Sequence, residues 1–154
     1  MKLYPNCKIN LGLNIVGKRA DGYHNIETIF LPIPLSDCLE IEPAHEDSFV
    51  IDGRELDCSA QDNLVVKVLN MLRTEDIDVP PVAIKLTKNI PSGAGLGGGS
   101  SDAAFMMKGL NELFDLGLTE QQMAARVGRL GADCPVFIAN KPVYDEMSLA
   151  FSLA

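Results

Sequence analysis

Apolar and polar residues alternate along most of the first third of the chain. In residues 7–16 every second side chain is apolar, and this period of two predicts a strand with one buried face that includes Leu11. The same pattern recurs in residues 24–33, 37–43 and 47–52. Asp21-Gly22 predicts a hairpin turn after the first strand, and Pro32 and Pro34 predict the end of the second. We therefore expect a run of antiparallel β-structure.

The spacing of apolar residues then changes to three or four, which is the period of a helix. It predicts helices over residues 62–76, 101–114 and 119–131, and strands over residues 80–90 and 134–140. Asp62 is the expected N-cap of the first helix. Thr119 and Gln122 have the spacing of a capping box, and Gly131 is the expected stop of the helix that they begin. The whole pattern is that of one α+β domain.

Composition narrows the choice of partners. The chain has 154 residues, 47% of them hydrophobic, with a formal net charge of −8. These values suit a globular domain with a hydrophobic core and argue against a nucleic-acid partner, which would need a basic surface. An anion would have to be bound locally, by backbone amides, a helix N-terminus or a few lysines.

Four cysteines show neither Cys-x-x-Cys pairs nor a histidine-rich partner segment, so we do not expect a zinc site. Reduced, mostly buried thiols are the simpler interpretation. Polar residues interrupt the apolar ones near the N-terminus, unlike in a signal peptide, and no apolar run has the length of a membrane span. These features predict a cytoplasmic protein with no membrane partner.

Glycines are concentrated between the predicted strand 80–90 and the helix that follows it. Glycine loses more conformational freedom on folding than any other residue, so this density needs a reason. Backbone amides that surround phosphates at a helix N-terminus would supply one. Ser100 or Ser101 is the expected helix cap. For Asp102, expected in the first turn, charge balance, magnesium handling and capping all remain open.

Three other interpretations of this loop fit less well. A dinucleotide-binding fold would need an acidic residue at the end of a second strand about 20 residues on, but Glu112 and Asp115 fall within or at the end of the predicted helix. A Walker loop would need a lysine before its Ser or Thr, whereas Gly99 precedes Ser100. A flexible linker rarely joins a well-patterned strand to a well-patterned helix.

Three stretches together resemble one family. The segment "PSGAGLGGGSSDAA" resembles the phosphate loop of the galactokinase, homoserine kinase, mevalonate kinase and phosphomevalonate kinase (GHMP) superfamily. The segments "PNCKINLGLNIVGKRADGYHNIETIF" and "GADCPVF" are similar to motifs of its branch that acts on a cytidylyl substrate. The resemblance implies the N-terminal ATP-binding domain of the GHMP fold, a mixed or antiparallel sheet packed with helices, with ATP and Mg²⁺ as cofactors.

The resemblance covers residues 1–142, which we expect to form the ATP-binding kinase domain. Members of the family continue with a second domain of similar size. Residues 143–154 do not match it and are expected to be an atypical C-terminal tail. The chain is therefore expected to be a truncated form of the kinase.

The implied reaction transfers a phosphoryl group from ATP to the 2-hydroxyl of 4-diphosphocytidyl-2-C-methyl-D-erythritol, in non-mevalonate isoprenoid biosynthesis. Lys8 and Asp133 match the catalytic pair of the family. Their chemistry suits the task, because an aspartate can accept the hydroxyl proton while a lysine stabilises the charge that develops. From the residues alone, a surface lysine and a turn-capping aspartate are the simpler interpretation.

The same resemblance supplies the binding residues. It implies that Tyr23 stacks on the cytosine ring, that His24 pairs with the polar edge of the base, and that Phe30 lines the other side. Asn10 matches a residue near the substrate, and it shares a strand face with Lys8 because side chains two positions apart do so. Without the resemblance, a packed tyrosine and a solvated histidine in a hairpin would be expected.

Nine positions match the ATP site. They are Gly93, Gly95, Gly97, Gly98, Gly99, Ser100 and Ser101 around the phosphates, and Asn63 and Lys88 near the adenine. A helix N-terminal residue and a strand-end lysine are equally good interpretations of the last two. No magnesium ligand is assigned.

Three other functions remain open. A sister kinase of the superfamily would act on homoserine or on a phosphorylated isoprenoid precursor. A catalytically inactive fragment would bind nucleotide without turnover. A fragment of a dinucleotide-binding oxidoreductase is the third alternative. The oligomeric state is not predicted.

Overall fold

The computed structural model describes residues 1–18, 20, 23–53 and 60–150. Its strands are β1 (Lys2–Leu3), β2 (Asn6–Lys18), β3 (Tyr23–Ser36), β4 (Cys38–Pro43), β5 (Ser48–Gly53), β6 (Val82–Lys88) and β7 (Val143–Ala150). Its helices are the short 3-10 helix η1 (Ala60–Asp62), α1 (Leu64–Thr74), α2 (Gly98–Leu113), α3 (Glu120–Val127) and α4 (Val136–Ala139). The predicted mixture of strands and helices is confirmed.

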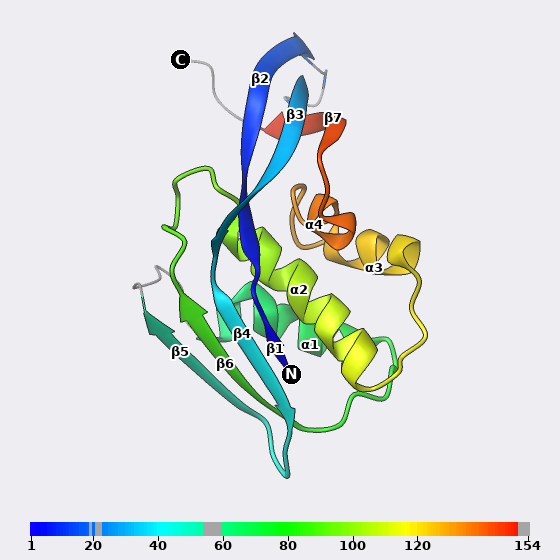
Figure 1. The fold of residues 1–154 in the computed structure, drawn as a ribbon. Coiled ribbons are helices and arrows are strands. Elements are labelled where there is room, and N and C mark those ends of the chain that lie inside the picture. Colours follow the sequence, from blue (N-terminus) through cyan, green and yellow to red (C-terminus); the bar gives the residue numbers. More distant parts are fainter. Residues whose placement is uncertain (19, 21–22, 54–59, 151–154) are drawn as a thin grey trace.

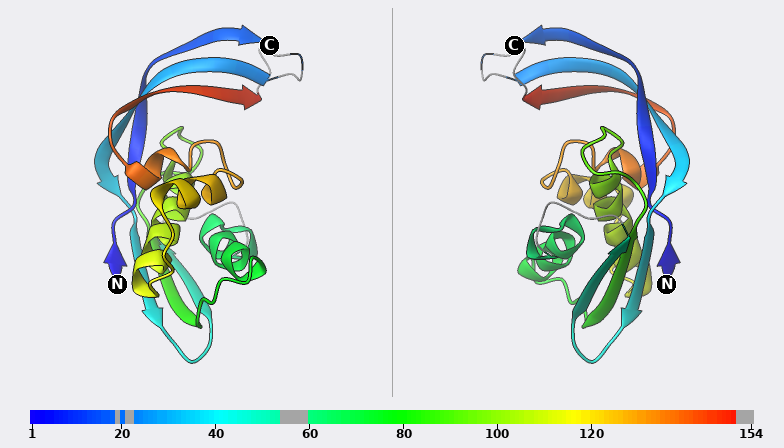
Figure 2. Two further views of the ribbon diagram at one scale, coloured as in Figure 1. Left: turned by 90° about the vertical axis from the view of Figure 1, so that its right-hand side faces the viewer. Right: turned by 90° about the vertical axis from the view of Figure 1, so that its left-hand side faces the viewer.

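The strands form two sheets. One has the order β1-β4-β6-β5 and the other β2-β3-β7. Helices α1 and α2 cover one face of the four-stranded sheet, while the three-stranded sheet projects away from this layer and curves (Figures 1 and 2). The chain passes from β3 directly into β4, so one continuous stretch of β-structure joins the two sheets.

Pairing in the sheets confirms part of the predicted topology. β2 and β3 are antiparallel, as the hairpin prediction requires, although Asp21-Gly22 lies outside the described residues. The expectation of purely antiparallel structure is wrong for β5, which pairs in parallel with β6. The intervening η1 and α1 provide the crossover that parallel pairing needs. Residues of the expected tail form β7, paired antiparallel with β3, and the boundary at residue 142 stays a prediction.

The prolines do not end β3, contrary to expectation. The strand continues to Ser36, and Pro32 lies opposite Lys8 of β2. The pairing of β3 with β7 extends only from Tyr23 to Phe30. Along the described residues beyond Phe30, that edge of β3 has no β7 partner, so a proline removes no ladder hydrogen bond there.

The core lies between the four-stranded sheet and the two long helices. Of the five apolar residues predicted to form a stripe on α1, four are buried and Leu64 is partly buried; the four are Val65, Val68, Leu69 and Leu72. The α2 residues Met106, Met107 and Leu110 are buried as well. Leu39, Ile41, Ile84 and Leu86 face them from β4 and β6. At Gly109 the helix approaches most closely, because an added Cβ would lie 2.8 Å from the Cδ1 atoms of Ile41 and Leu3.

The boundaries of α1 and α3 differ from two expectations. Asn63, not Asp62, is the N-cap of α1, and its Oδ1 accepts a hydrogen bond from Val65 N. The capping box of Thr119 and Gln122 is confirmed, but α3 ends at Val127 rather than at Gly131.

The predicted strand 134–140 contains helix α4 instead. An apolar run this short has no period that separates a helix from a strand. The backbone of Pro135 is in the helical region, and Lys108 Nζ donates to Phe137 O over 2.8 Å. Asn140, with a φ of 55°, then ends the helix in the left-handed region.

Leu11 is also placed differently from the prediction, since it is 45% exposed rather than buried. Its partner on β3, Ile29, is 46% exposed. Both lie on the outer face of the three-stranded sheet, away from the helical layer.

Asp47 connects the start of β5 to α1 and β6. Its carboxylate accepts hydrogen bonds from both terminal nitrogens of Arg73 and, over 2.9 Å, from Val82 N. The hydrogen bond from Arg73 is the main cause that lowers the pKa of Asp47. A carboxylate whose pKa is lowered by folding contributes stability above its unfolded pKa of about 4 and loses it as the pH falls.

We expect Asp47→Asn to lower the free energy of unfolding by about 1 kcal/mol at neutral pH, since the ion pair is largely exposed and one backbone hydrogen bond is weakened. Thermal unfolding of both forms across the pH range measures this, and the difference should shrink as the pH falls below about 4. Glu46→Gln, at an exposed neighbouring carboxylate, is the control. A difference that is independent of pH would contradict the assignment.

Candidate active site

The loop between β6 and α2 has a backbone that only glycine adopts at low cost. Gly93, Gly95 and Gly97 have φ values of 70°, 74° and 72°. A Cβ at Gly93 or Gly95 would meet no atom within 4 Å, so at those two positions conformation rather than space accounts for glycine. A Cβ at Gly97 would lie 3.1 Å from both Lys8 Cε and Phe137 Cζ. The last glycine of the loop therefore packs against the predicted catalytic lysine.

Helix α2 begins at Gly98 without a side-chain cap, because its N-cap is Gly97. The expectation that Ser100 or Ser101 caps the helix is therefore wrong, and Asp102 lies beyond the first turn. Uncapped amides at a helix N-terminus attract anions through their N–H groups and the helix dipole. The Ser101 hydroxyl is also buried, and it has no hydrogen-bond partner among the described residues.

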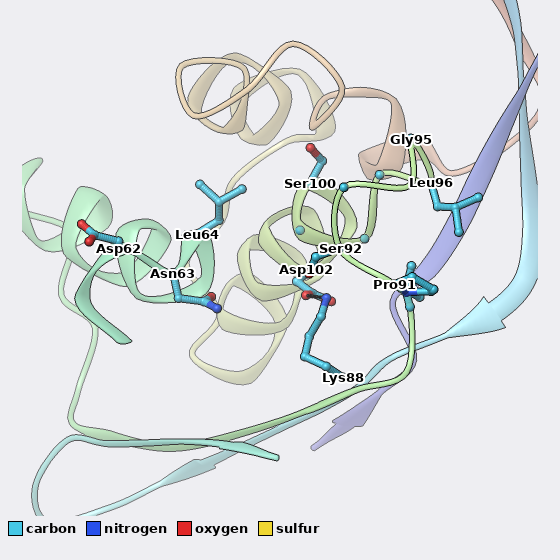
Figure 3. A pocket seen from close by; sticks show the side chains of 15 residues that line it. Asp62, Asn63, Leu64, Lys88, Pro91, Ser92, Gly95, Leu96, Ser100 and Asp102 are labelled. Atoms are coloured by element: carbon cyan, nitrogen blue, oxygen red, sulfur yellow. Dashed lines mark hydrogen bonds and ion pairs between the residues drawn. The ribbon is translucent and has the colours of Figure 1, made fainter. Parts of the chain in front are cut away.

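These elements surround a pocket of about 410 Å³. Asp62, Asn63 and Leu64 form one side, and the loop around Gly95 and Leu96 forms the other, with the start of α2 between them (Figure 3). The predicted ATP-site residues that line it are Asn63, Lys88, Gly93, Gly95, Gly97, Gly98, Gly99 and Ser100. The exception is Ser101, which is buried inside α2. The structure thus brings residues from α1, β6 and the loop to one concavity.

Lys8 and Asp133 lie next to this loop. Lys8 Nζ is 3.6 Å from Asp133 Oδ2, with side-chain exposures of 4% and 30% respectively. Lys8 N also donates to Leu96 O over 2.9 Å, which attaches β2 to the glycine loop. A buried ammonium can stabilise negative charge that develops on a reacting group, and a partly exposed carboxylate beside it can accept a proton.

A pair of side-chain amides joins the segments that carry Lys8 and Asp133. Asn6 Nδ2 donates to Asn140 Oδ1 over 3.2 Å, and Asn140 Nδ2 donates to Asn6 Oδ1 over 2.6 Å. Asn6 begins β2, and Asn140 follows α4. This reciprocal amide bridge was not predicted, since nothing in the periodicity of either segment pairs the two residues.

Lys88 contacts the carboxyl groups of two buried aspartates. Its Nζ is 2.5 Å from Asp37 Oδ2 and 2.7 Å from Asp102 Oδ2, and all three side chains are buried. Burial alone would lower the pKa of Lys88, but Asp102 and Asp37 outweigh it and raise the pKa. Asp37 escaped the sequence analysis because an acidic residue just before a strand looks like an ordinary turn residue. Contact of Lys88 with adenine stays a prediction.

The predicted substrate residues are placed less completely. Asn10 is exposed and lies opposite Phe30 in the β2–β3 register. Phe30 is 2% exposed and meets Phe137 edge to face, with ring centroids 5.1 Å apart. The backbones of Tyr23 and His24 belong to β3, and their side chains lie outside the described residues. Contacts of these four residues with a nucleobase stay predictions.

Two kinds of feature are absent from the described part of the chain. It contains no group of three or more His, Cys, Asp and Glu side chains able to hold a metal ion. It also contains no helix long and apolar enough to cross a membrane.

Comparison with known proteins shows the family. The GHMP kinases N terminal domain matches residues 63–141. A protein from Porphyromonas gingivalis named 4-diphosphocytidyl-2-C-methyl-D-erythritol kinase is 52% identical over 145 residues, covering 93% of this chain and 53% of that protein. A protein of the same name from Bacteroides fragilis is 53% identical over 150 residues, covering 95% and 54%. The chain thus spans about half the length of the curated relatives it matches.

Solved structures agree with this. A crystal structure of a 4-(cytidine 5'-diphospho)-2C-methyl-D-erythritol kinase has a TM-score of 0.80 and 33% identity, covering 100% of this chain and 56% of that one. The mevalonate kinase of Methanococcus jannaschii, with a TM-score of 0.67 and 17% identity over 95% of this chain and 53% of that one, shares the fold. The chain belongs to the GHMP kinases and has the α+β fold of their N-terminal domain.

Proposed function

We propose that this chain supplies the ATP-binding half of a kinase that phosphorylates the 2-hydroxyl of 4-diphosphocytidyl-2-C-methyl-D-erythritol. One observation carries the proposal. The uncapped N-terminus of α2 and its glycine loop lie directly beside the Lys8–Asp133 pair. The names of the relatives support the choice of substrate. A cytoplasmic location, where ATP is available, is part of the proposal.

In this proposal the protein contributes position and charge. Backbone N–H groups of the loop and of the first turn of α2 bind the phosphates of ATP. Lys8 neutralises negative charge on the transferring group, and Asp133 accepts the proton of the attacking hydroxyl. Magnesium would neutralise the β- and γ-phosphate oxygens.

A second candidate function is nucleotide binding without turnover, because the chain spans only about half the length of its relatives. Calorimetric titration with ATP and with NAD, followed by a phosphoryl-transfer assay, separates the candidates. The proposal requires ATP binding. Tight binding of NAD without ATP would overturn it, and ATP binding without product would leave the second candidate.

Asp133→Asn should lower kcat by roughly 100-fold or more while ATP affinity stays within about threefold, because the amide cannot accept the hydroxyl proton. The assay compares this chain with a form extended to the length of its relatives. Asp115→Asn, at a carboxylate beyond the end of α2, is the control. Equal loss of kcat in both variants would contradict a specific role for Asp133.

Gly97→Ala and Gly93→Ala form a matched pair. Both replace a glycine of positive φ, so both cost roughly 1 kcal/mol or more in backbone strain, but only the Cβ at position 97 meets Lys8. We expect the Gly97 variant to lose about tenfold more kcat/KM than the Gly93 variant. Steady-state kinetics measure the difference, and equal losses would show that contact with Lys8 is unimportant.

Tyr23→Ala should weaken binding of the cytidylyl substrate by about tenfold, since stacking on a base contributes roughly 1–3 kcal/mol. The affinity for ATP should not change. Substrate KM and ATP KM, measured in the same preparation, test this. Unchanged substrate KM would exclude stacking at Tyr23 and favour a sister kinase of the superfamily.

A further inference from the structure

Three ionisable side chains are buried together beneath the start of α2. Asp37 precedes β4, Lys88 ends β6 and Asp102 lies on α2, and their exposures are 0%, 3% and 2%. A Cβ at Gly98 would lie 3.4 Å from Lys88 Nζ, so the ammonium lies close to the first residue of the helix. If both carboxylates were ionised, the cluster would carry an uncompensated negative charge. Burying such a charge costs several kcal/mol.

The hydrogen-bond donors show which carboxyl group is ionised. Asp37 Oδ1 accepts hydrogen bonds from Asn89 N and Ile90 N, over 2.7 and 2.9 Å, and Asp37 Oδ2 accepts from Lys88. All three partners donate, so each of them favours the carboxylate form. Asp102 receives one such bond, from Lys88, and Asp102 Oδ1 has no partner among the described residues. The proton that balances the charge therefore belongs on Asp102.

Electrostatics point the same way. Burial, followed by a hydrogen bond with the Asp37 carboxyl, raises the pKa of Asp102 well above its ordinary value and outweighs the attraction of Lys88. Among the described residues that line this pocket, the ionisable ones are Lys88, Asp102 and, at the rim, Asp62. Because Asp102 lies beyond the first turn of α2, the helix dipole does little to favour its charged form.

The network also connects the two ends of the glycine loop. Asp37 binds the backbone N–H groups of Asn89 and Ile90, where the loop leaves β6. Asp102 belongs to the helix that the loop enters, and Lys88 joins the two carboxyl groups across it. Figure 3 shows Lys88 and Asp102 pointing toward one another below the pocket.

We propose that Asp102 is a neutral carboxylic acid, and that Asp37, Lys88 and Asp102 are positioning residues that fix the glycine loop without adding negative charge beside bound phosphates. The positioning part of this proposal rests on the proposed function, namely on a nucleotide occupying the pocket. The protonation part does not, and the two are tested separately.

The first test is the carbon-13 NMR signal of the Asp102 carboxyl in the nucleotide-free chain. Loss of one signal in Asp102→Asn assigns it. We expect the chemical shift of a neutral acid at neutral pH, and the shift of a carboxylate would overturn the proposal. No nucleotide is involved, so this result is independent of whether the chain binds ATP.

The second test is stability against pH. A carboxyl whose pKa is raised by folding costs stability as the pH rises from its unfolded pKa toward its folded one, because only the unfolded state has released the proton. The Tm of Asp102→Asn minus that of the wild type should therefore increase between about pH 4.5 and about pH 8. The same difference for Asp47→Asn should stay nearly constant over this range, because the contribution of Asp47 is complete above its unfolded pKa of about 4. A flat or decreasing difference for the Asp102 variant overturns the proposal.

The third test is ATP affinity, by calorimetry on the same chain. Asp102→Ala should weaken binding by about fivefold, the effect of losing one hydrogen bond that orders the loop. Asp102→Asn should restore most of that loss, since an amide has the shape and neutrality of the acid. Equal weakening in both variants would overturn the positioning role. Failure of the wild type to bind ATP would instead reject the proposed function and leave the protonation results standing.

Discussion

The backbone of the glycine loop is the constraint on which the site depends. Positive φ values at Gly93, Gly95 and Gly97 let the chain leave β6 and enter α2 with no side chain at three of the loop positions that line the pocket. The same conformation leaves the first amides of α2 without a cap. A side-chain cap there would satisfy those N–H groups and leave them unable to bind an anion. The start of α2 therefore lacks the stabilisation of a side-chain cap, and its first N–H groups stay available for an anion.

A loop of this kind needs support from outside itself, because glycines supply no packing. Three contacts provide it. Lys8 N on β2 donates a hydrogen bond to Leu96 O, and Asp37 accepts one from Asn89 N at the start of the loop. At the end of the loop, Asp102 on α2 contacts Lys88. Further along α2, the close approach of Gly109 to Ile41 fixes the helix on the sheet. The glycine loop is therefore held at its ends by hydrogen bonds, and the helix that follows it is held on the sheet by close packing.

The sequence contained enough information for the fold and for the neighbourhood of the site. Strongly periodic segments such as α1 and α2 were predicted because a long stripe of apolar residues spaced three or four apart is compatible only with a helix. The short run that forms α4 has no period, and one contact that supports its helix comes from Lys108, 29 positions before Phe137 in the sequence. Leu11 was predicted to be buried because alternation indicates two faces without showing which of them another element covers.

The site shows the same limit. Resemblance to known motifs was enough to single out Lys8 and Asp133, which the fold brings within 3.6 Å across 125 positions of sequence. Asp37 and the partnering of Lys88 could not be foreseen, because buried ion pairs between separate strands and helices leave no spacing signal.

The amide bridge between Asn6 and Asn140 has one more consequence. Its two hydrogen bonds join uncharged groups, so dissolved ions do not screen them. The attraction between Lys8 and the partly exposed Asp133, by contrast, weakens as ionic strength rises. In concentrated salt the amide bridge therefore continues to join the segments that carry Lys8 and Asp133, whereas the attraction between the two charges is reduced.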